Sequence, residues 1–332
     1  MGPMRKLLFP VSLVYALVVR IRNLLYDVGL FRSTSFEVPT LCVGNLSVGG
    51  TGKTPMVELL LRELGKERKL AVLSRGYKRR SKGFFLAGTD ATVAQLGDEP
   101  YQLKNKFPGV QVAVDADRRN GILRLGQTVA PDLIILDDAF QHRRVRPSFS
   151  ILLTTHDSLY VDDWYLPTGD LRDSKRAADR ADVIVVTKCP EDLGERAAKA
   201  IREKLRPKPH QTVLFAKLAY GTDFWGAHGP VGKETVAKGR FTLVTGIAKP
   251  APLVRYLRGQ GHDFEHLAYP DHHFFTEKQL DVLRSKPLVV TTEKDFMRLG
   301  KQVPHAIYLP VEHAFLWNGR KALLDKLATS GI

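Results

Sequence analysis

The chain has 332 residues, 44% of them hydrophobic and 26% charged, so it is long enough for two folded domains and too apolar to be a disordered protein. It carries 50 lysines and arginines against 35 aspartates and glutamates, and the net charge of +15 indicates either a merely basic surface or an anionic partner, such as nucleic acid, an anionic membrane or a phosphorylated substrate. The two cysteines, Cys42 and Cys189, are too few for a disulfide framework or a zinc site and fit a reducing compartment.

The first predicted element is an apolar helix over residues 7–25. Basic residues precede it at Arg5 and Lys6 and interrupt it at Arg20 and Arg22. The run is short for a membrane span, which needs about 20 predominantly apolar residues, and no small-residue cleavage site of a signal peptide follows it. The pattern favours a helix at a membrane surface, with its arginines toward phosphate headgroups, over a helix packed on the protein's own core.

A strand over residues 38–43, a glycine-rich turn and a helix over residues 56–64 come next. The turn reads Gly49-Gly50-Thr51-Gly52-Lys53-Thr54, and its place between a strand and a helix is the context of a nucleotide-binding P-loop. In such a loop the backbone amides and the helix N-terminus bind phosphate groups. Lys53 is predicted to reach the terminal phosphates, and the Thr54 hydroxyl to ligate Mg²⁺. Ser47 replaces the first glycine of the full pattern.

Further strands are predicted over residues 70–73, 110–114, 132–136, 149–153 and 183–187, with helices over 99–106 and 119–125 between them. Apolar strands that alternate with helices indicate a parallel sheet covered on both faces, with ligands beyond the carboxyl ends of the strands. The strand over 132–136 runs into Asp137 and Asp138. Aspartates also serve as caps and turns, but beside a P-loop a carboxylate at a strand end can hold the Mg²⁺ of a nucleotide. The two motifs together predict Mg-nucleotide binding.

Two polar clusters are candidates for acid–base chemistry. Asp98 and Glu99 stand at a predicted helix start, where Asp98 is either a helix cap or a base near the transferred phosphate. His272 stands between Asp271 and His273 and can take a proton near neutral pH. The alternatives for this second cluster are an ordinary surface loop and a metal site, which would lack a third ligand.

A basic run over residues 75–82 follows the strand over 70–73 and contains Arg75 and Tyr77. Its arginines and lysines either hold an anionic headgroup or nucleotide phosphate, or form a solvated loop.

A second set of strands is predicted over residues 213–218, 241–245, 264–267 and 288–292, with helices between them. The composition shifts near Pro207 and Pro209. We therefore assign residues 1–210 to the N-terminal helix and the P-loop nucleotide-binding domain, and residues 211–332 to a smaller C-terminal α/β domain that contributes to the active-site cleft.

Seven motifs, taken in order, resemble one family, and the resemblance covers nearly the whole chain. They are Gly-Gly-Thr-Gly-Lys-Thr-Pro from residue 49, Ser-Arg-Gly-Tyr from 74, Gly-Asp-Glu-Pro from 97, Asp-Asp-Ala-Phe-Gln-His from 137, Leu-Pro-Thr-Gly-Asp-Leu-Arg from 166, Asp-His-His from 271 and Thr-Glu-Lys-Asp from 292. The family is the tetraacyldisaccharide 4′-kinase of bacterial lipid A synthesis. Two positions depart from its pattern: Ala139 stands where glycine is usual, and Asp173-Ser174 where Glu-Pro is usual.

The resemblance implies a reaction, a place and a fold. The family transfers the γ-phosphate of ATP, with Mg²⁺, to the 4′-hydroxyl of a tetraacylated disaccharide 1-phosphate at the cytoplasmic face of the bacterial inner membrane. The implied fold is a three-layer α/β/α P-loop domain with a mostly parallel sheet, a second, smaller α/β/α domain and a membrane-associating N-terminal helix. We expect a monomer that binds an anionic membrane surface and no nucleic acid.

The resemblance also implies roles for single residues. Asp98 is the expected catalytic carboxylate, His272 its partner from the second domain, and Lys53 the cation on the phosphates. Thr54, Asp137 and Asp138 are expected on the metal side. The remaining motif residues expected to line the substrate or phosphate site are Arg75, Tyr77, Glu99, His142 and Arg172.

Two other classes of protein share part of this pattern. A membrane-surface P-loop ATPase or GTPase that acts as a switch would have the P-loop, the aspartate pair and the N-terminal helix, but it needs no second domain and no acceptor. The Asn-Lys-x-Asp motif of guanine specificity is missing after the strand over 183–187. A nucleic-acid-binding ATPase is supported by the net charge alone, because no recognition motif accompanies it.

Overall fold

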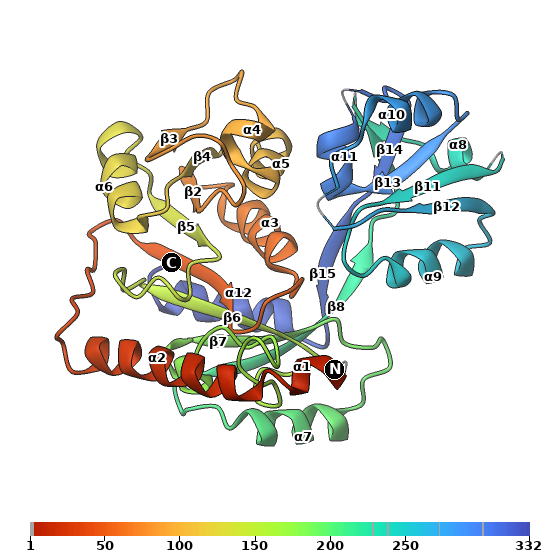
Figure 1. Ribbon diagram of the computed structural model, residues 1–332. Coiled ribbons are helices and arrows are strands. Elements are labelled where there is room, and N and C mark those ends of the chain that lie inside the picture. The colour runs from red at the N-terminus through yellow and green to blue at the C-terminus, as the bar shows by residue number, and fades with distance from the viewer. Residues whose placement is uncertain (1–2, 228, 238, 272, 301) are drawn as a thin grey trace.

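The computed structural model describes residues 3–227, 229–237, 239–271, 273–300 and 302–332, which form two α/β units that lie side by side (Figure 1). The larger unit contains a nine-stranded sheet in the order β15-β8-β7-β6-β1-β5-β2-β4-β3. The central pairs of this sheet are all parallel, and antiparallel pairs occur only at its two edges. Its strands are β1 (Thr40–Asn45), β2 (Leu70–Ser74), β3 (Phe85–Leu86), β4 (Gln111–Val114), β5 (Leu133–Asp137), β6 (Phe149–Thr155), β7 (Val183–Thr187), β8 (Thr212–Tyr220) and β15 (Val311–Phe315).

Helices cover both faces of the larger sheet, which explains why its central strands are apolar along their whole length. The core on one face includes side chains of α3 (Lys53–Leu64), α5 (Asp98–Lys106) and α12 (Gly319–Thr329). The core on the other face includes side chains of α6 (Arg118–Thr128) and α7 (Glu195–Leu205). The short helices α4 (Val93–Leu96) and η1 (Lys175–Arg180) lie in the connections. The predicted three-layer domain with a mostly parallel sheet is confirmed.

The smaller unit repeats this architecture on a six-stranded sheet in the order β10-β9-β14-β13-β11-β12. Its strands are β9 (Phe224–Gly226), β10 (Gly229–Val231), β11 (Phe241–Thr245), β12 (Phe264–Ala268), β13 (Val289–Thr292) and β14 (Ala306–Leu309). Its helices are α8 (Lys233–Ala237), α9 (Ala251–Gly259), α10 (Glu277–Arg284) and α11 (Glu293–Leu299). Apolar side chains of α9 pack on one face of the sheet and those of α10 and α11 on the other.

The boundary between the units differs from the predicted one at residues 210 and 211. Strands β8 and β15 both belong to the larger sheet, and the chain leaves it only after Tyr220. At the junction the amide of Gly221 donates a 2.8 Å hydrogen bond to the carbonyl of Pro310, so the two crossing segments run side by side. Helix α12 returns to the larger unit and buries Leu323 and Leu327 in its core. The smaller unit therefore spans residues 221–310.

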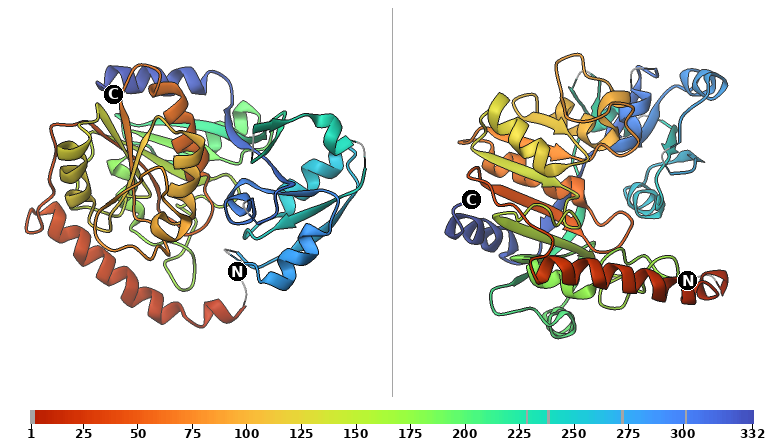
Figure 2. Two further views of the ribbon diagram at one scale, coloured as in Figure 1. Left: turned by 90° about the horizontal axis from the view of Figure 1, so that it is seen from above. Right: turned by 60° about the vertical axis from the view of Figure 1, so that its left-hand side comes forward.

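Helix α2 (Phe9–Asp27), which follows the short α1 (Pro3–Lys6), lies as a rod along the outside of the larger unit (Figure 2). Three of its polar side chains attach it to the segment 166–173. Ser12 Oγ donates to Thr168 Oγ1 over 2.7 Å, Tyr15 donates to the carbonyl of Arg172 over 3.1 Å, and Asn23 Nδ2 donates to Asp173 Oδ1 over 2.8 Å.

The outer side of α2 is apolar and exposed. Its exposed apolar side chains include seven that are each 49–64% accessible: Val11, Leu13, Val14, Leu17, Val18, Ile21 and Leu24. Among the described residues α2 is the one helix that is long and apolar enough, by length and composition, to cross a membrane, and 17% of the qualifying stretch is buried inside the protein. The sequence predicted a helix too short to cross a membrane, but the 19-residue α2 is long enough by length and composition.

Candidate active site

The P-loop lies between β1 and α3 and is fixed from beneath by three side chains. Asn45 Nδ2 donates to Thr51 Oγ1 over 2.9 Å, and Thr187 Oγ1 donates to the carbonyl of Thr51 over 2.8 Å. His313 Nε2 donates to the carbonyl of Gly52 over 2.8 Å. Burial lowers the pKa of His313 to about 4, so this histidine stays neutral. The protein's own side chains therefore support the conformation of the loop.

Two glycines of the loop have left-handed backbones, which only glycine adopts readily. Gly49 has φ +112° and Gly52 has φ +88°, and a Cβ at Gly52 would lie 2.7 Å from His313 Cε1. Ser47, which replaces the first glycine of the pattern, donates its hydroxyl to Asp163 Oδ2 over 2.7 Å and so anchors the start of the loop. Helix α3 begins at Lys53, so its N-terminal amides face the loop as phosphate binding requires.

The two aspartates at the end of β5 have different electrostatic surroundings. Asp137 is buried and accepts a 3.0 Å hydrogen bond from Ser74. Burial, with Glu99 and Asp138 nearby, raises the pKa of Asp137 to about 7 although Lys53 acts in the opposite direction. For Asp138, burial also raises the pKa, but Lys53 and Arg172 outweigh it and the pKa falls below its ordinary value.

This concentration of carboxylates suits a bound divalent cation. Lys53 Nζ lies 3.7 Å from Asp138 Oδ2, and Arg172 donates to both oxygens of the same carboxylate. Asp137 has the opposite balance: burial and the neighbouring carboxylates of Glu99 and Asp138 outweigh Lys53 and raise its pKa to about 7. A divalent cation between the two carboxylates would favour their ionised forms. No group of three His, Cys, Asp or Glu side chains in the described residues could hold a metal alone. Mg²⁺ does not need one, because phosphates and water complete its shell.

Three more of the predicted lining residues, Arg172, His142 and Arg75, belong to the larger unit and have different surroundings. Arg172 donates to Asn45 Oδ1 as well as to Asp138, which joins the 166–172 segment to the P-loop strand. His142 Nε2 lies 3.6 Å from Asp117 Oδ1; burial and Arg118 lower the pKa of His142. Arg75 is exposed at the end of β2.

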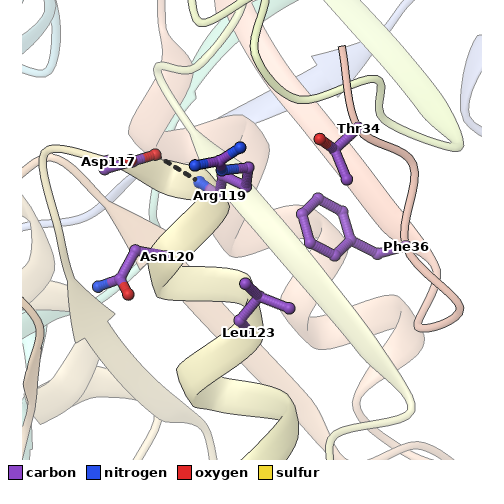
Figure 3. A pocket seen from close by; sticks show the side chains of 6 residues that line it. All are labelled: Thr34, Phe36, Asp117, Arg119, Asn120 and Leu123. Atoms are coloured by element: carbon purple, nitrogen blue, oxygen red, sulfur yellow. Dashed lines mark hydrogen bonds between the residues drawn. The ribbon is translucent and has the colours of Figure 1, made fainter. Parts of the chain in front are cut away.

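A cavity of about 520 Å³ opens beside this region, at the start of α6. Figure 3 shows its lining side chains, with Phe36 and Leu123 on an apolar wall and Arg119 and Asp117 on a polar one. Asp117 is the N-cap of α6, and its Oδ1 accepts a 3.0 Å hydrogen bond from the amide of Arg119. None of the P-loop residues lines it.

Asp98 is the first residue of α5 and meets the smaller unit. Its carboxylate accepts two hydrogen bonds from Arg298 of α11, a 3.0 Å bond from Nε to Oδ1 and a second from Nη2 to Oδ2. The residue before Asp98, Gly97, is the helix cap and has no side-chain cap bond, so Asp98 does not act as the N-cap. His272 lies outside the described residues, but its neighbour His273 offers its carbonyl to Arg298 Nη1 over 3.2 Å.

A second cavity, of about 440 Å³, lies between the two units beside this contact. It mixes aromatic, apolar and cationic side chains, among them Tyr77, Lys78, Asp98, Phe274, Met297 and Arg298. Tyr77, predicted to line the substrate site, is 64% exposed on its wall. The structure therefore brings Asp98 and Tyr77 to the junction between the units, and the P-loop, Glu99, Asp137, Asp138 and Arg172 together in the larger unit.

Several side chains of the site were missed by the sequence analysis. Lys188 follows β7, and its Nζ would lie 3.9 Å from a Cβ at Gly50. Burial and the positive charge of Lys249 in the smaller unit lower the pKa of Lys188. Two cations that face each other at a phosphate-binding loop have this effect, because each disfavours the charged form of the other. The position of Lys188 at the carboxyl end of a parallel strand was a usable signal. No sequence signal marked Arg298 or His313 as site residues. Arg298 lies within the helical segment of α11, five residues after its start, and His313 lies inside strand β15.

Comparison with known proteins identifies relatives over the full length. A sequence model described as tetraacyldisaccharide-1-P 4′-kinase matches residues 4–330. The chain is 46% identical to the tetraacyldisaccharide 4′-kinase of Flavobacterium johnsoniae over 322 residues, covering 95% of this chain and 94% of that one. It is 42% identical to the protein of the same name from Phocaeicola vulgatus, covering 94% and 91%. A crystal structure titled as the "apo" form of LpxK from Aquifex aeolicus in complex with ATP superimposes with a TM-score of 0.82 at 27% identity, covering 98% of this chain and 99% of that one.

Proposed function

The chain belongs to the tetraacyldisaccharide-1-P 4′-kinase family, and we propose from this premise that it transfers the γ-phosphate of ATP to the 4′-hydroxyl of a tetraacylated disaccharide 1-phosphate. One observation carries the proposal beyond nucleotide binding: the carboxylate of Asp98 is held at the junction of the units by Arg298 of the smaller unit. A switch ATPase, which has no acceptor to deprotonate, has no need of such a contact. The position is that of a base for an acceptor bound between the units.

The P-loop binds and orients the nucleotide. Its amides and the N-terminus of α3 take the phosphate oxygens, and Lys53 neutralises charge that grows on the transferred group in a loose transition state. Lys53 is 14% exposed and is directed by Asp138, so little reorganisation precedes the reaction. Thr54 with Asp137 and Asp138 would hold Mg²⁺, which would supply positive charge to the bridging phosphate oxygens. Lys53 and Arg172 lower the pKa of Asp138 and so favour its ionised form.

Asp98 accepts the proton of the sugar hydroxyl as the phosphate is transferred. Both its oxygens accept from one guanidinium, yet a carboxylate has about four acceptor sites, so a hydroxyl can still donate to it. His272 is proposed as its partner by the match of motif. Closure of the smaller unit over the larger would exclude water and limit loss of ATP to hydrolysis.

The acylated acceptor reaches the site along α2. The exposed apolar side of this helix enters the acyl boundary of a membrane, while exposed Lys6 and Arg20 meet anionic headgroups. The segment 166–173, which binds α2, also carries Arg172, and Arg172 donates to Asp138. This one segment therefore contacts both the membrane-facing helix and the aspartate pair. We place the protein as a monomer on the cytoplasmic face of the bacterial inner membrane, with no nucleic-acid partner.

A transfer assay tests the function. Purified protein, Mg²⁺ and γ-labelled ATP are incubated with the tetraacylated disaccharide 1-phosphate in detergent, and the label is followed into the lipid fraction. The expected result is label in the lipid with wild-type protein and almost none with Lys53→Ala. ATP hydrolysis without labelled lipid, in folded protein, would favour the switch ATPase instead.

A further inference from the structure

We propose that Arg298 is a positioning residue that orients the carboxylate of Asp98 and makes its orientation depend on the seating of the smaller unit. The inference rests on the assignment of Asp98 as the base under the proposed function. The two residues stand 200 positions apart in the chain, on α11 and α5. No motif that led to the family assignment contains Arg298, which follows the Thr-Glu-Lys-Asp motif by three residues.

The geometry of the contact fixes the plane of the carboxylate. Nε and Nη2 of Arg298 each donate to a different oxygen of Asp98, so a flat guanidinium faces a flat carboxylate in the two-bond arrangement. The side chains of Arg298 and Asp98 are only 5% and 14% exposed, so water competes little for either. Rotation of the carboxylate would break both bonds at once.

The guanidinium is in turn tied to the core of the smaller unit. Its Nη1 donates to the carbonyl of His273 and lies 3.6 Å from Asp295 Oδ1. Asp295 is fully buried and accepts from the amide of Gly246 over 2.8 Å and from Thr292 Oγ1 over 2.7 Å. A continuous chain of contacts therefore leads from the end of β11 to the carboxylate on α5, and it passes the segment that carries Asp271 and His273.

A second ion pair also joins α5 to α11, so the effect of Arg298 on Asp98 can be distinguished from its effect on attachment of the two units. Lys106, at the far end of α5, contacts Glu293 at the first turn of α11 over 2.6 Å and Glu58 of α3 over 2.7 Å. This bridge joins the same two helices without touching Asp98. Loss of Arg298 therefore leaves one ionic attachment between the units in place but removes the two hydrogen bonds that Arg298 gives to the carboxylate of Asp98.

The test compares Arg298→Ala, Arg298→Lys and a matched control, Arg284→Ala, which removes an arginine that pairs with two exposed carboxylates of α10 and donates to the carbonyl of Gln302. Because misplacement of a catalytic group can cost about 100-fold, we expect kcat of Arg298→Ala to fall about that much, with KM for ATP and for the acceptor within about 3-fold of wild type. Arg298→Lys keeps the positive charge but cannot donate two parallel hydrogen bonds to the carboxylate, so its kcat should lie between those of wild type and Arg298→Ala. Millimolar guanidinium should restore part of kcat in Arg298→Ala only.

Thermal protection by Mg-ATP checks that each variant is folded. The inference is overturned if kcat of folded Arg298→Ala stays within about 3-fold of wild type, or if kcat falls without any rescue by guanidinium or lysine. Failure of the underlying function looks different: wild-type protein would then not phosphorylate the lipid at all. An active Asp98→Asn would remove the base assignment, whatever Arg298 does.

Discussion

A buried pair of glutamates predicts how the stability of the protein depends on pH. Glu293 begins α11 in the smaller unit and faces Glu58 of α3, with Lys106 Nζ 2.6 Å from the first carboxylate and 2.7 Å from the second. Burial, then Glu58, raises the pKa of Glu293 from 4.5 to about 7, although Lys106 and Arg62 lower it. Folding therefore favours the protonated form of Glu293 over the ionised form.

The sign follows from proton binding. Between pH 4.5 and 7 the folded protein keeps a proton on Glu293 that the unfolded chain has released, so stability falls as pH rises through this window. A displacement of 2.5 pH units corresponds to about 3 kcal/mol of unfolding free energy at about 1.4 kcal/mol per unit. Glu293→Gln, a neutral side chain of the same shape, should exceed wild type in stability by less than about 1 kcal/mol near pH 5 and by about 3 kcal/mol at pH 8.

Urea unfolding of both proteins between pH 5 and pH 8 measures this difference, and titrating groups that do not interact with Glu293 cancel in the comparison. The control is Glu277→Gln, whose side chain is 76% exposed on α10 and should change stability by no more than about 0.5 kcal/mol at any pH. If wild type and Glu293→Gln show the same pH dependence, Glu293 is ionised throughout and the reasoning from its burial is wrong.

Other substitutions test the P-loop and the membrane-facing helix. Lys53→Met should lower kcat about 100- to 1,000-fold in the lipid phosphorylation assay, because it removes a cation aimed at the transferred group. Gly52→Ala should lower stability by about 2 kcal/mol in thermal unfolding and abolish protection by Mg-ATP, since its φ is +88° and its Cβ would meet a buried ring at 2.7 Å. Gly126→Ala, inside α6 with nothing within 4 Å, should instead leave stability unchanged or raise it by about 0.5–1 kcal/mol. Leu17→Asp should weaken sedimentation with anionic vesicles about 30-fold or more, through loss of about 2 kcal/mol of apolar burial and repulsion from the headgroups. Equal binding by Leu17→Asp and by the control Val282→Asp, at an exposed apolar residue of α10, would contradict a docking role for α2.

The larger sheet and its phosphate-binding loop could be predicted because the relevant signals are local. Apolar strands of five or six residues, a glycine-rich turn before a helix and an aspartate pair at a strand end each lie within one short window. The sheet then brings Lys53 and Asp138 within 3.7 Å, as the rule for carboxyl ends of parallel strands requires.

The boundary of the smaller unit could not be read in the same way. Pro207 and Pro209 look like a linker, but they only connect α7 to β8, which belongs to the larger sheet. Strand β15 returns to that sheet about 100 residues after the predicted boundary, and no local pattern reveals which sheet a short strand joins.

The contact between Asp98 and Arg298 also lay beyond local patterns. Asp98 was singled out for its place at a helix start, where a cap explained it equally well. Its partner depends on how α11 packs against α5, which only the assembled units determine. Pairing between residues this far apart in the chain is a tertiary property, which local sequence patterns do not encode.

The most direct test of Asp98 as the base is the effect of Asp98→Asn on single-turnover phosphate transfer, with Mg-ATP affinity measured on the same preparation. We expect the rate of lipid phosphorylation to fall about 100- to 10,000-fold, the range typical for loss of a general base, while affinity for Mg-ATP stays within about 3-fold of wild type. Transfer at the wild-type rate by folded Asp98→Asn would contradict the central claim that this carboxylate, presented between the two units, takes the proton of the acceptor.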